Sequence, residues 1–281
     1  IATPAIYITD PLRVFRLDFE ANLRIVKLCG KHHTRVVFPS TSEVYGMCQD
    51  ELFNPDTSNL VLGPISKERW IYACSKQLLD RVIWAMGHHE HLPFTLFRPF
   101  NWVGPGLDSI STEKIGSSRV VTQFLGQILR KEPLKLVDGG GQRRSFTDIR
   151  DGIDALVKII ANRDGCADRQ IFNVGHPGND LSIRELAEKL ISLTAGMGHD
   201  LRRALPEPIQ EVTSQEYYGN AYQDMLKRRP WIDNTRERLD WNPRVGMDEL
   251  LRNASTFFIK EFNTQEMSVY DYYLAHPEFL K

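Results

Sequence analysis

The sequence predicts an α/β fold in which a Rossmann-like parallel sheet precedes a smaller C-terminal lobe. Short β-branched and apolar runs at 35–40 (RVVFPS), 94–99 (FTLFRP) and 170–175 (QIFNVG) have the character of buried parallel strands. Segments of helical periodicity lie between them, and this alternation indicates a parallel sheet with right-handed crossovers. Beyond residue 176 the pattern changes to helices and irregular segments, which indicates a second lobe.

The helices are predicted from apolar spacing and from end signals. The first covers about 11–29 and ends at Gly30, and the second covers 75–89. In the second lobe, Ser182 and Glu185 form a capping box at the start of SIRELAEKLI, and a further helix covers 247–262. A helix over 151–162 carries four apolar residues on one face: Ile153, Leu156, Val157 and Ile160.

The composition narrows the function classes. The 281 residues contain 35 Lys and Arg against 36 Asp and Glu, so the chain has no basic field that would attract nucleic acid. No apolar run reaches the roughly 18 residues that a membrane helix needs, and the N-terminal residues do not resemble a signal peptide. The four cysteines have no CxxC spacing, which argues against a disulfide framework and a structural zinc site. We therefore expect a cytoplasmic protein without a metal.

A tyrosine and a lysine four residues apart are the most informative pair. Tyr72 and Lys76 (WIYACSK) share one face at the start of the second predicted helix. An ammonium beside a phenol lowers its pKa toward neutrality, so that the phenolate can accept a proton from a sugar hydroxyl. The pattern alone occurs by chance in many helices. Its context is more specific, because the strand at 35–40 runs into TSEVYG and places Thr41, Ser42 and Glu43 at the carboxyl end of a parallel strand, where open sheets bind ligands.

These residues and the segment FRPFNWVGP resemble the extended short-chain dehydrogenase/reductase family, whose members act on nucleotide-sugars with a tightly held NAD. The segments KIGSSR, RRSFTDIRDGI and YYGNAYQD are similar to the UDP-glucuronate decarboxylases of the aminoarabinose pathway, which modifies lipid A and gives polymyxin resistance. The resemblance implies that residues 1–175 form a partial NAD-binding portion, with substrate-lobe insertions around 101–140. It implies a substrate-binding lobe in residues 176–281.

The resemblance also implies roles for single residues. The catalytic set is Tyr72, Lys76, Ser42, Thr41, Glu43 and Arg228. The substrate-binding set is Ala2, Tyr7, Arg69, Asn101, Arg119, Lys135, Arg144 and Tyr222. The cofactor-binding set is Thr3, Tyr72 and Lys76. Arg228 holds the family position of a proton donor beside the acid Glu43, but an arginine pKa above about 12 favours orientation of a carboxylate or delivery through water.

The reaction that the resemblance implies is NAD-dependent oxidative decarboxylation of UDP-glucuronate to a UDP-4-keto-pentose, with release of CO2 and NADH. Oxidation at C4 makes a ketone β to the C6 carboxylate, and such an acid loses CO2 because the electron pair delocalises into the new carbonyl. Two alternatives stay open: a UDP-xylose synthase that retains NADH, and a non-catalytic UDP-sugar-binding module. A 4-epimerase would have no use for Glu43 and Arg228 as a carboxylate-handling pair. The family also implies a homodimer, or a higher homo-oligomer, through paired helices that include 75–89.

One expected element is absent from the sequence. The glycine-rich strand–turn–helix that cradles the NAD pyrophosphate does not occur, and DGGGQ at 138–142 lies too late to replace it. IATP at 1–4 resembles the fourth strand of the family's sheet. We expect that the preceding βα units belong to a longer protein, and the alternative is a chain that lost them and no longer binds NAD.

Overall fold

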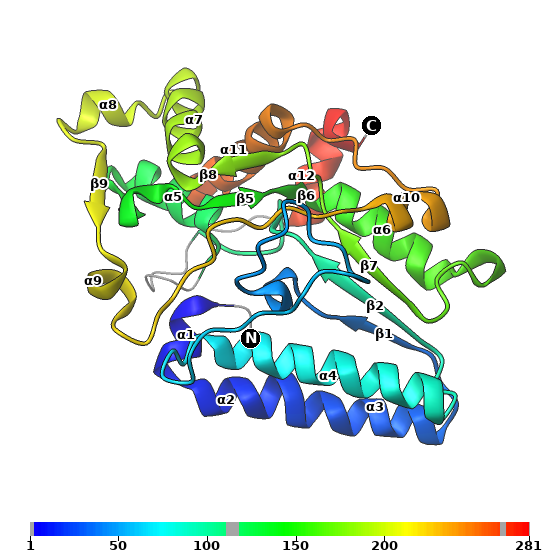
Figure 1. The fold of residues 1–281 in the computed structure, drawn as a ribbon. Coiled ribbons are helices and arrows are strands. Elements are labelled where there is room, and N and C mark those ends of the chain that lie inside the picture. Colours follow the sequence, from blue (N-terminus) through cyan, green and yellow to red (C-terminus); the bar gives the residue numbers. More distant parts are fainter. Residues whose placement is uncertain (1–2, 111–117, 265–267, 281) are drawn as a thin grey trace.

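The computed structural model describes residues 3–110, 118–264 and 268–280 (Figure 1). Its central sheet has three parallel strands in the order β1-β2-β7, namely β1 (Val36–Pro39), β2 (Phe94–Pro99) and β7 (Gln170–Val174). Val36 pairs with Phe94, and Leu96 pairs with Ile171. The predicted α/β class with a parallel sheet is confirmed.

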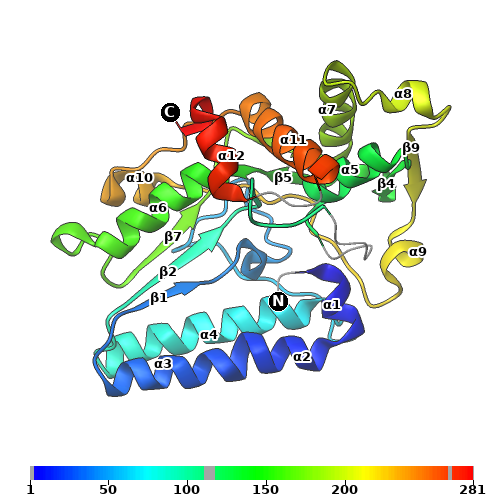
Figure 2. The same ribbon diagram turned by 180° about the vertical axis from the view of Figure 1, so that it is seen from behind.

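Helices cover both faces of this sheet (Figures 1 and 2). On one face, α3 (Asn22–Lys31) and α4 (Trp70–His89) pack in a core with Leu96. On the other face, α6 (Ile149–Ala161) packs in a core with Phe97. Neighbouring residues of a strand point to opposite faces, so Leu96 and Phe97 mark the two sides.

This arrangement corrects the predicted handedness. The strand order runs in one direction from β1 through β2 to β7, yet the connecting helices α4 and α6 lie on opposite faces. Two parallel crossovers that step in the same direction on opposite faces have opposite hands, so they are not both right-handed. The exception is the connection from β2 to β7, a long excursion through the second lobe and not a single helix.

The N-terminal helix is interrupted where the sequence predicts continuity. After α1 (Pro4–Thr9) and α2 (Pro11–Phe15), a π-helical turn covers Arg16–Ala21, and α3 follows directly. The wider turn buries Asp18 against α4. Gly30 lies inside α3, which ends at Lys31, so the predicted end was one residue early.

The second lobe has its own core, formed mainly by α5 (Val120–Arg130), α7 (Ile183–Gly196) and α11 (Met247–Thr264). The predicted capping box is confirmed: the Ser182 hydroxyl accepts from the Glu185 amide, and the Glu185 carboxylate accepts from the Ser182 amide. Two small sheets line this lobe, parallel β4 (Leu134–Val137) with β9 (Ile209–Val212) and antiparallel β5 (Arg143–Ser145) with β8 (Asp180–Ser182).

Shorter elements complete the described chain. They are the 3-10 turns η2 (Ser42–Tyr45), η3 (Asp138–Gly140), η4 (Arg163–Gly165) and η5 (Pro277–Leu280), the strands β3 (Trp102–Val103) and β6 (Thr147–Asp148), and the helices α8 (Leu201–Ala204), α9 (Ser214–Tyr218), α10 (Asp233–Leu239) and α12 (Val269–Ala275). Helix α10 packs beside α6 near the central sheet, although it comes after residue 176. No helix in the described part of the chain is both long and apolar enough to span a bilayer.

The apolar face predicted for the helix over 151–162 is largely exposed. Ile153, Val157 and Ile160 of α6 are 50%, 58% and 60% exposed, whereas Ala155 and Ile159 are buried against the sheet. The helix is therefore apolar on two sides, and the periodicity alone did not show which side meets the sheet.

Candidate active site

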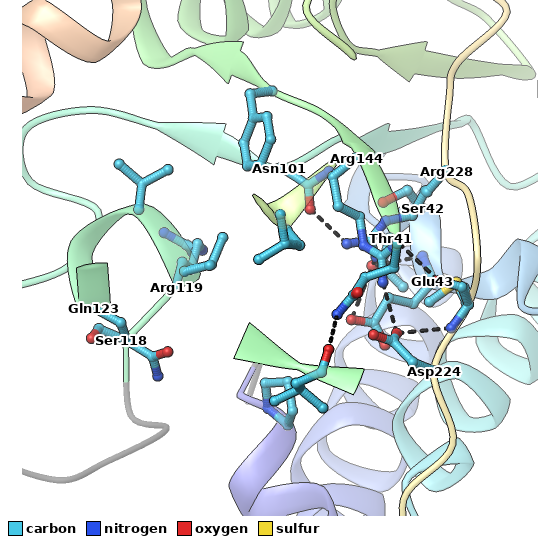
Figure 3. Close-up of a pocket in the computed structure, with 18 of the residues that line it drawn as sticks. Thr41, Ser42, Glu43, Asn101, Ser118, Arg119, Gln123, Arg144, Asp224 and Arg228 are labelled. Carbon is cyan, nitrogen blue, oxygen red and sulfur yellow. Dashed lines mark hydrogen bonds and ion pairs between the residues drawn. The ribbon is translucent and has the colours of Figure 1, made fainter. Parts of the chain in front are cut away.

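A pocket of about 310 Å³ opens at the carboxyl ends of β1 and β2, between the central sheet and the second lobe. Figure 3 shows its two walls. One wall carries Thr41, Ser42, Glu43, Asn101, Arg144, Asp224 and Arg228, and the other carries Ser118, Arg119 and Gln123. Thr41, Ser42, Glu43 and Asn101 follow strands of the central sheet, whereas Arg119 and Gln123 belong to the start of α5 in the second lobe. A ligand in the pocket would therefore contact both the sheet and the second lobe.

The turn after β1 presents three polar residues to the pocket. Thr41 is extended and caps η2, because its hydroxyl accepts a hydrogen bond from the Glu43 amide at 3.2 Å. This cap ends the strand sharply and turns Ser42 and Glu43 toward the pocket. The sequence predicts these residues at this edge of the sheet, and the structure places them there.

Tyr72 faces the pocket from the first turn of α4 and is 5% exposed. The Tyr7 ring lies parallel to it, with centroids 4.6 Å apart and an angle of 8° between the planes. Burial raises the pKa of Tyr72, and the Glu43 carboxylate raises it further, while a hydrogen bond with Thr41 opposes both. The prediction of a lowered Tyr72 pKa is therefore wrong for this structure.

Lys76 does not offset this rise in the Tyr72 pKa, because its ammonium is paired elsewhere. Its Nζ donates to the Pro39 carbonyl at 3.2 Å and lies 3.5 Å from Asp18 Oδ1, so a buried carboxylate already balances the ammonium. Burial lowers the pKa of Lys76, and Asp18 opposes this shift. Lys76 lies behind Tyr72 and outside the pocket lining, where it ties α4 to the end of β1.

Glu43 lies between two buried arginines. Its Oε2 is 3.2 Å from Arg69 Nη2, and its Oε1 is 3.5 Å from Arg228 Nη1. Arg228 Nη2 also donates to Asn101 Oδ1 at 2.5 Å, while Asn101 donates to the Ser145 carbonyl at 2.8 Å. Burial lowers the pKa of Arg228, and the nearby Arg144 charge lowers it further.

The two buried arginines have unused donors. Arg69 Nε and Nη1 and Arg228 Nε have no hydrogen-bond partner among the described residues. Arg69 is 2% exposed and stacks on Trp70, 4.4 Å from the ring centroid. Buried guanidinium donors without partners indicate a place for an anionic or strongly polar ligand.

Arg144 is held by a residue that the sequence analysis did not select. Arg144 Nη2 donates to Asp224 Oδ1 at 2.7 Å, and Arg144 Nη1 donates to the Met225 and Arg143 carbonyls, each at 2.8 Å. Burial raises the pKa of Asp224, but the Arg144 and then the Arg69 charges outweigh it and hold that pKa below the usual value. Asp224 is thus an ionised carboxylate in the pocket wall.

The opposite wall supplies two cations at the start of α5 and on β4. The backbone and side chain of Arg119 both contact Asp108, with Nη1 3.4 Å from Oδ1. Lys135 lines the pocket from β4, and its β4 neighbours pair with β9. Arg119 lies across the pocket from Glu43 (Figure 3). The two cations suit an extended anion such as a diphosphate.

Most of the predicted site residues meet in this pocket. Those that line it are Thr41, Ser42, Glu43, Tyr72, Arg228, Tyr7, Arg69, Asn101, Arg119, Lys135, Arg144 and Tyr222. Thr3 lies outside the lining, where its carbonyl accepts from the Ile6 and Tyr7 amides at the start of α1. Ala2 lies outside the described residues.

Among the lining residues that the sequence analysis missed are Tyr217, Tyr218 and Asp224. All three belong to the segment YYGNAYQD, from which the resemblance gave a role only to Tyr222. Tyr218 stacks on Tyr222 with centroids 4.0 Å apart. No group of three or more His, Cys, Asp or Glu in the described part of the chain could hold a metal ion.

The chain is similar in sequence and in fold to known proteins. The model of the NAD dependent epimerase/dehydratase family matches residues 1–175. The PbgP3 protein from Burkholderia pseudomallei is 53% identical over 94% of this chain and 75% of that chain, with a TM-score of 0.82.

Two more distant structures show the fold alone. UDP-glucose 4-epimerase from Thermotoga maritima, solved with UDP-glucose, is 22% identical over 93% of this chain and 75% of that chain, with a TM-score of 0.75. dTDP-glucose 4,6-dehydratase from Bacillus anthracis, solved with NAD, is 19% identical over 89% of this chain and 70% of that chain, with a TM-score of 0.71.

The pocket residues fit the nicotinamide end of NAD. Tyr72 brings a phenol into the pocket at the carboxyl edge of the sheet. Lys76 follows one turn later on α4, outside the pocket lining, and its ammonium has one donor beyond its contacts with Pro39 and Asp18. The fit concerns this end only, because the sequence holds no glycine-rich strand–turn–helix for the pyrophosphate. The predicted family resemblance is confirmed: the chain belongs to the NAD-dependent epimerase/dehydratase family, and its cofactor is NAD.

Proposed function

We propose that the protein catalyses the NAD-dependent oxidative decarboxylation of UDP-glucuronate to a UDP-4-keto-pentose, with release of CO2 and NADH. The observation that carries this proposal is the Glu43 carboxylate held between Arg69 and Arg228 in the same pocket as Tyr72. A sugar without a carboxylate would not need a glutamate and two arginines next to the base that deprotonates C4. The unused Arg69 and Arg228 donors support a bound carboxylate.

The first step assigned to this chain is proton removal at C4. Tyr72 accepts the proton of the C4 hydroxyl as a phenolate, a form that burial and Glu43 disfavour in the protein alone and that the positive charge of bound NAD would favour. The Thr41 and Ser42 hydroxyls donate to the developing C4 carbonyl oxygen. When bound, NAD supplies the hydride acceptor for C4. Tyr7 covers one face of the Tyr72 ring and fixes its plane, so the phenol oxygen is positioned before the substrate enters.

The second step is cleavage of the bond between C5 and C6. The C6 carboxylate leaves as CO2, and its electron pair delocalises through C5 into the C4 carbonyl as an enolate. A water ordered by Arg228, or Glu43 after it has taken up a proton from solvent, then protonates C5. Arg228 and Asn101 hold each other at 2.5 Å, so the guanidinium has a fixed place beside the reacting carbons.

Product analysis of the full-length protein with NAD and carboxyl-labelled UDP-glucuronate tests the proposal. We expect labelled CO2, NADH and UDP-4-keto-pentose in equal amounts. UDP-xylose without net NADH would instead identify a UDP-xylose synthase, and UDP-galacturonate with retention of the label would identify a 4-epimerase. Binding of UDP-glucuronate without any turnover would identify a binding module.

Two further features belong to the proposal. Ile25 and Leu28 of α3 and Trp84 of α4 are 58%, 57% and 41% exposed, which supports a homodimer through these helices. Cys29, Cys48, Cys74 and Cys166 are all free thiols, which supports a cytoplasmic location.

A further inference from the structure

The pocket wall that contains Glu43 carries more positive than negative side chains, although it is largely buried. Three guanidinium groups, those of Arg69, Arg144 and Arg228, face two carboxylates, those of Glu43 and Asp224. All three arginines are less than a tenth exposed. This leaves a single positive charge in a poorly solvated wall, where charges interact strongly.

Asp224 is the carboxylate that lies close enough to affect all three arginines. It is bound directly to Arg144, and its charge also acts on Arg69 and Arg228. Its Oδ1 accepts from the Met225 amide at 2.8 Å as well as from Arg144, so the carboxylate cannot turn away from the arginines. Asp224 has no place in the proposed proton transfers, which leaves its position in the pocket wall unexplained by them.

We propose that Asp224 is a specificity-determining positioning residue, which fixes the arginines of this wall at one net positive charge and thereby matches the wall to a sugar with one carboxylate. The inference rests on the proposed function and extends it. A wall with two net positive charges would hold the substrate carboxylate more tightly. Decarboxylation moves the negative charge from C6 to the enolate, so tighter retention of the carboxylate stabilises the ground state more than the transition state.

The distinctive expectation is a change of KM and kcat in the same direction. In the full-length protein with NAD, Asp224→Asn should lower KM for UDP-glucuronate about fivefold and lower kcat about tenfold, the order expected for one added charge several ångströms away. The ratio of the affinities for UDP-glucuronate and UDP-glucose should rise about fivefold, because only the first ligand carries the carboxylate. Loss of a merely structural contact would raise KM and leave this ratio unchanged.

Two variants complete the design. Arg144→Gln combined with Asp224→Asn restores one net positive charge, and its affinity ratio should return to within about twofold of the wild-type value. The control is Asp180→Asn, which removes the carboxylate that accepts from Arg143 Nε at 2.8 Å. Arg143 precedes Arg144 on β5, and neither Arg143 nor Asp180 lines the pocket. The control should leave the affinity ratio unchanged.

The outcomes separate the two proposals. A raised KM or an unchanged affinity ratio in Asp224→Asn would overturn the role of Asp224. If that variant does not fold, the double variant decides, and an affinity ratio several-fold away from wild type overturns the role. Absence of CO2 release from the wild-type protein would overturn the proposed function, while the affinity ratios would still decide the role of Asp224.

Discussion

At the scale of single residues, the site is organised by pairing buried charges. Lys76 is balanced by Asp18, Glu43 by Arg69 and Arg228, and Arg144 by Asp224. Removal of one partner from a buried pair leaves an unpaired charge, which costs more than the loss of an exposed pair. Substitutions that keep shape but remove one charge or one hydroxyl are therefore the most informative.

Tyr72→Phe should abolish hydride transfer and leave UDP binding nearly unchanged. The substitution removes the only atom of the side chain that can accept the C4 proton and preserves the stack on Tyr7. NADH formation and UDP affinity, measured on the same preparation, check this. Substantial residual turnover would remove Tyr72 from the proposed role.

Glu43→Gln should block CO2 release, with a loss of at least about a hundredfold, because the amide can no longer act as an acid or base beside C5. It also leaves Arg69 and Arg228 without a shared counter-ion. Release of labelled CO2 at single turnover is the measurement. Unchanged release would mean that C5 is protonated without this carboxylate.

The stability difference between the wild type and Asp224→Asn should depend on pH. The Arg144 and Arg69 charges hold the pKa of Asp224 below 3.8, so the folded state binds its proton less tightly than the unfolded state does. Its contribution is therefore complete above about pH 4 and is lost as the pH falls through the folded-state pKa. Urea unfolding should show a less stable variant at pH 7 and a smaller gap at pH 3; a gap that widens in acid would contradict this.

The sequence predicted the part of the site that local motifs encode. Thr41 to Glu43 follow a strand, and Tyr72 with Lys76 begins a helix, so their places depend on short-range structure. Asp224 depends instead on a long-range contact, because the segment 219–231 must cross to Phe53 and Arg144 before the carboxylate reaches the pocket. No local pattern encodes such a contact, and for this reason Asp224 was missed.

At the scale of elements, α4 connects the site to the sheet, and its packing tolerates no added volume at Gly87. A Cβ on Gly87 would lie 2.2 Å from Phe94 Cε1, and Phe94 is fully buried at the start of β2. The helix can approach the strand this closely only because the residue has no side chain. Strand β2 and the Tyr72 turn of α4 are thereby held in a fixed relation.

Gly87→Ala should lower the free energy of unfolding by about 1–3 kcal/mol, because overpacking outweighs the better helix propensity of alanine. The matched control is Gly196→Ala at the end of α7, where a Cβ meets nothing within 4 Å. The control should be neutral or slightly stabilising. Chemical denaturation of both variants checks the pair, and equal effects would contradict the packing argument.

The elements themselves were predicted well where the pattern was regular. Strand β2 begins and ends at the predicted residues, while α4 begins five residues earlier than predicted, at Trp70. The π-helical turn at Arg16–Ala21 could not be predicted, because its sequence contains no proline or glycine to mark it. The turn is associated with the burial of Asp18 beside Lys76, which is a tertiary contact. Tertiary contacts set these details.

At the scale of the whole molecule, apolar residues remain on the outer face of the α3 and α4 layer. Ile25, Leu28 and Trp84 are each more than 40% exposed on helices that run alongside each other (Figure 2). Exposed apolar side chains on neighbouring helices favour association with a second copy. The proposed homodimer therefore has a definite test.

Leu28→Glu should shift the full-length protein from dimer toward monomer, because it places a charge in the proposed interface. Ile65→Glu is the control, since Ile65 is fully exposed in the loop that precedes α4 and lies on neither helix. Light scattering after gel filtration gives the mass of each. A Leu28→Glu protein that keeps the wild-type mass would place the interface elsewhere.

The opposite faces used by the two crossovers have a consequence for folding. Strand β7 adds to β2 only after the chain has left the sheet, formed α5 and β4 of the second lobe and returned through α6 on the other side. Pairing between such remote segments raises the contact order and slows folding. Arg119 reaches the pocket from a segment before β7 and Asp224 from a segment after it, so a nucleotide-sugar that contacts both walls should slow unfolding of both lobes together.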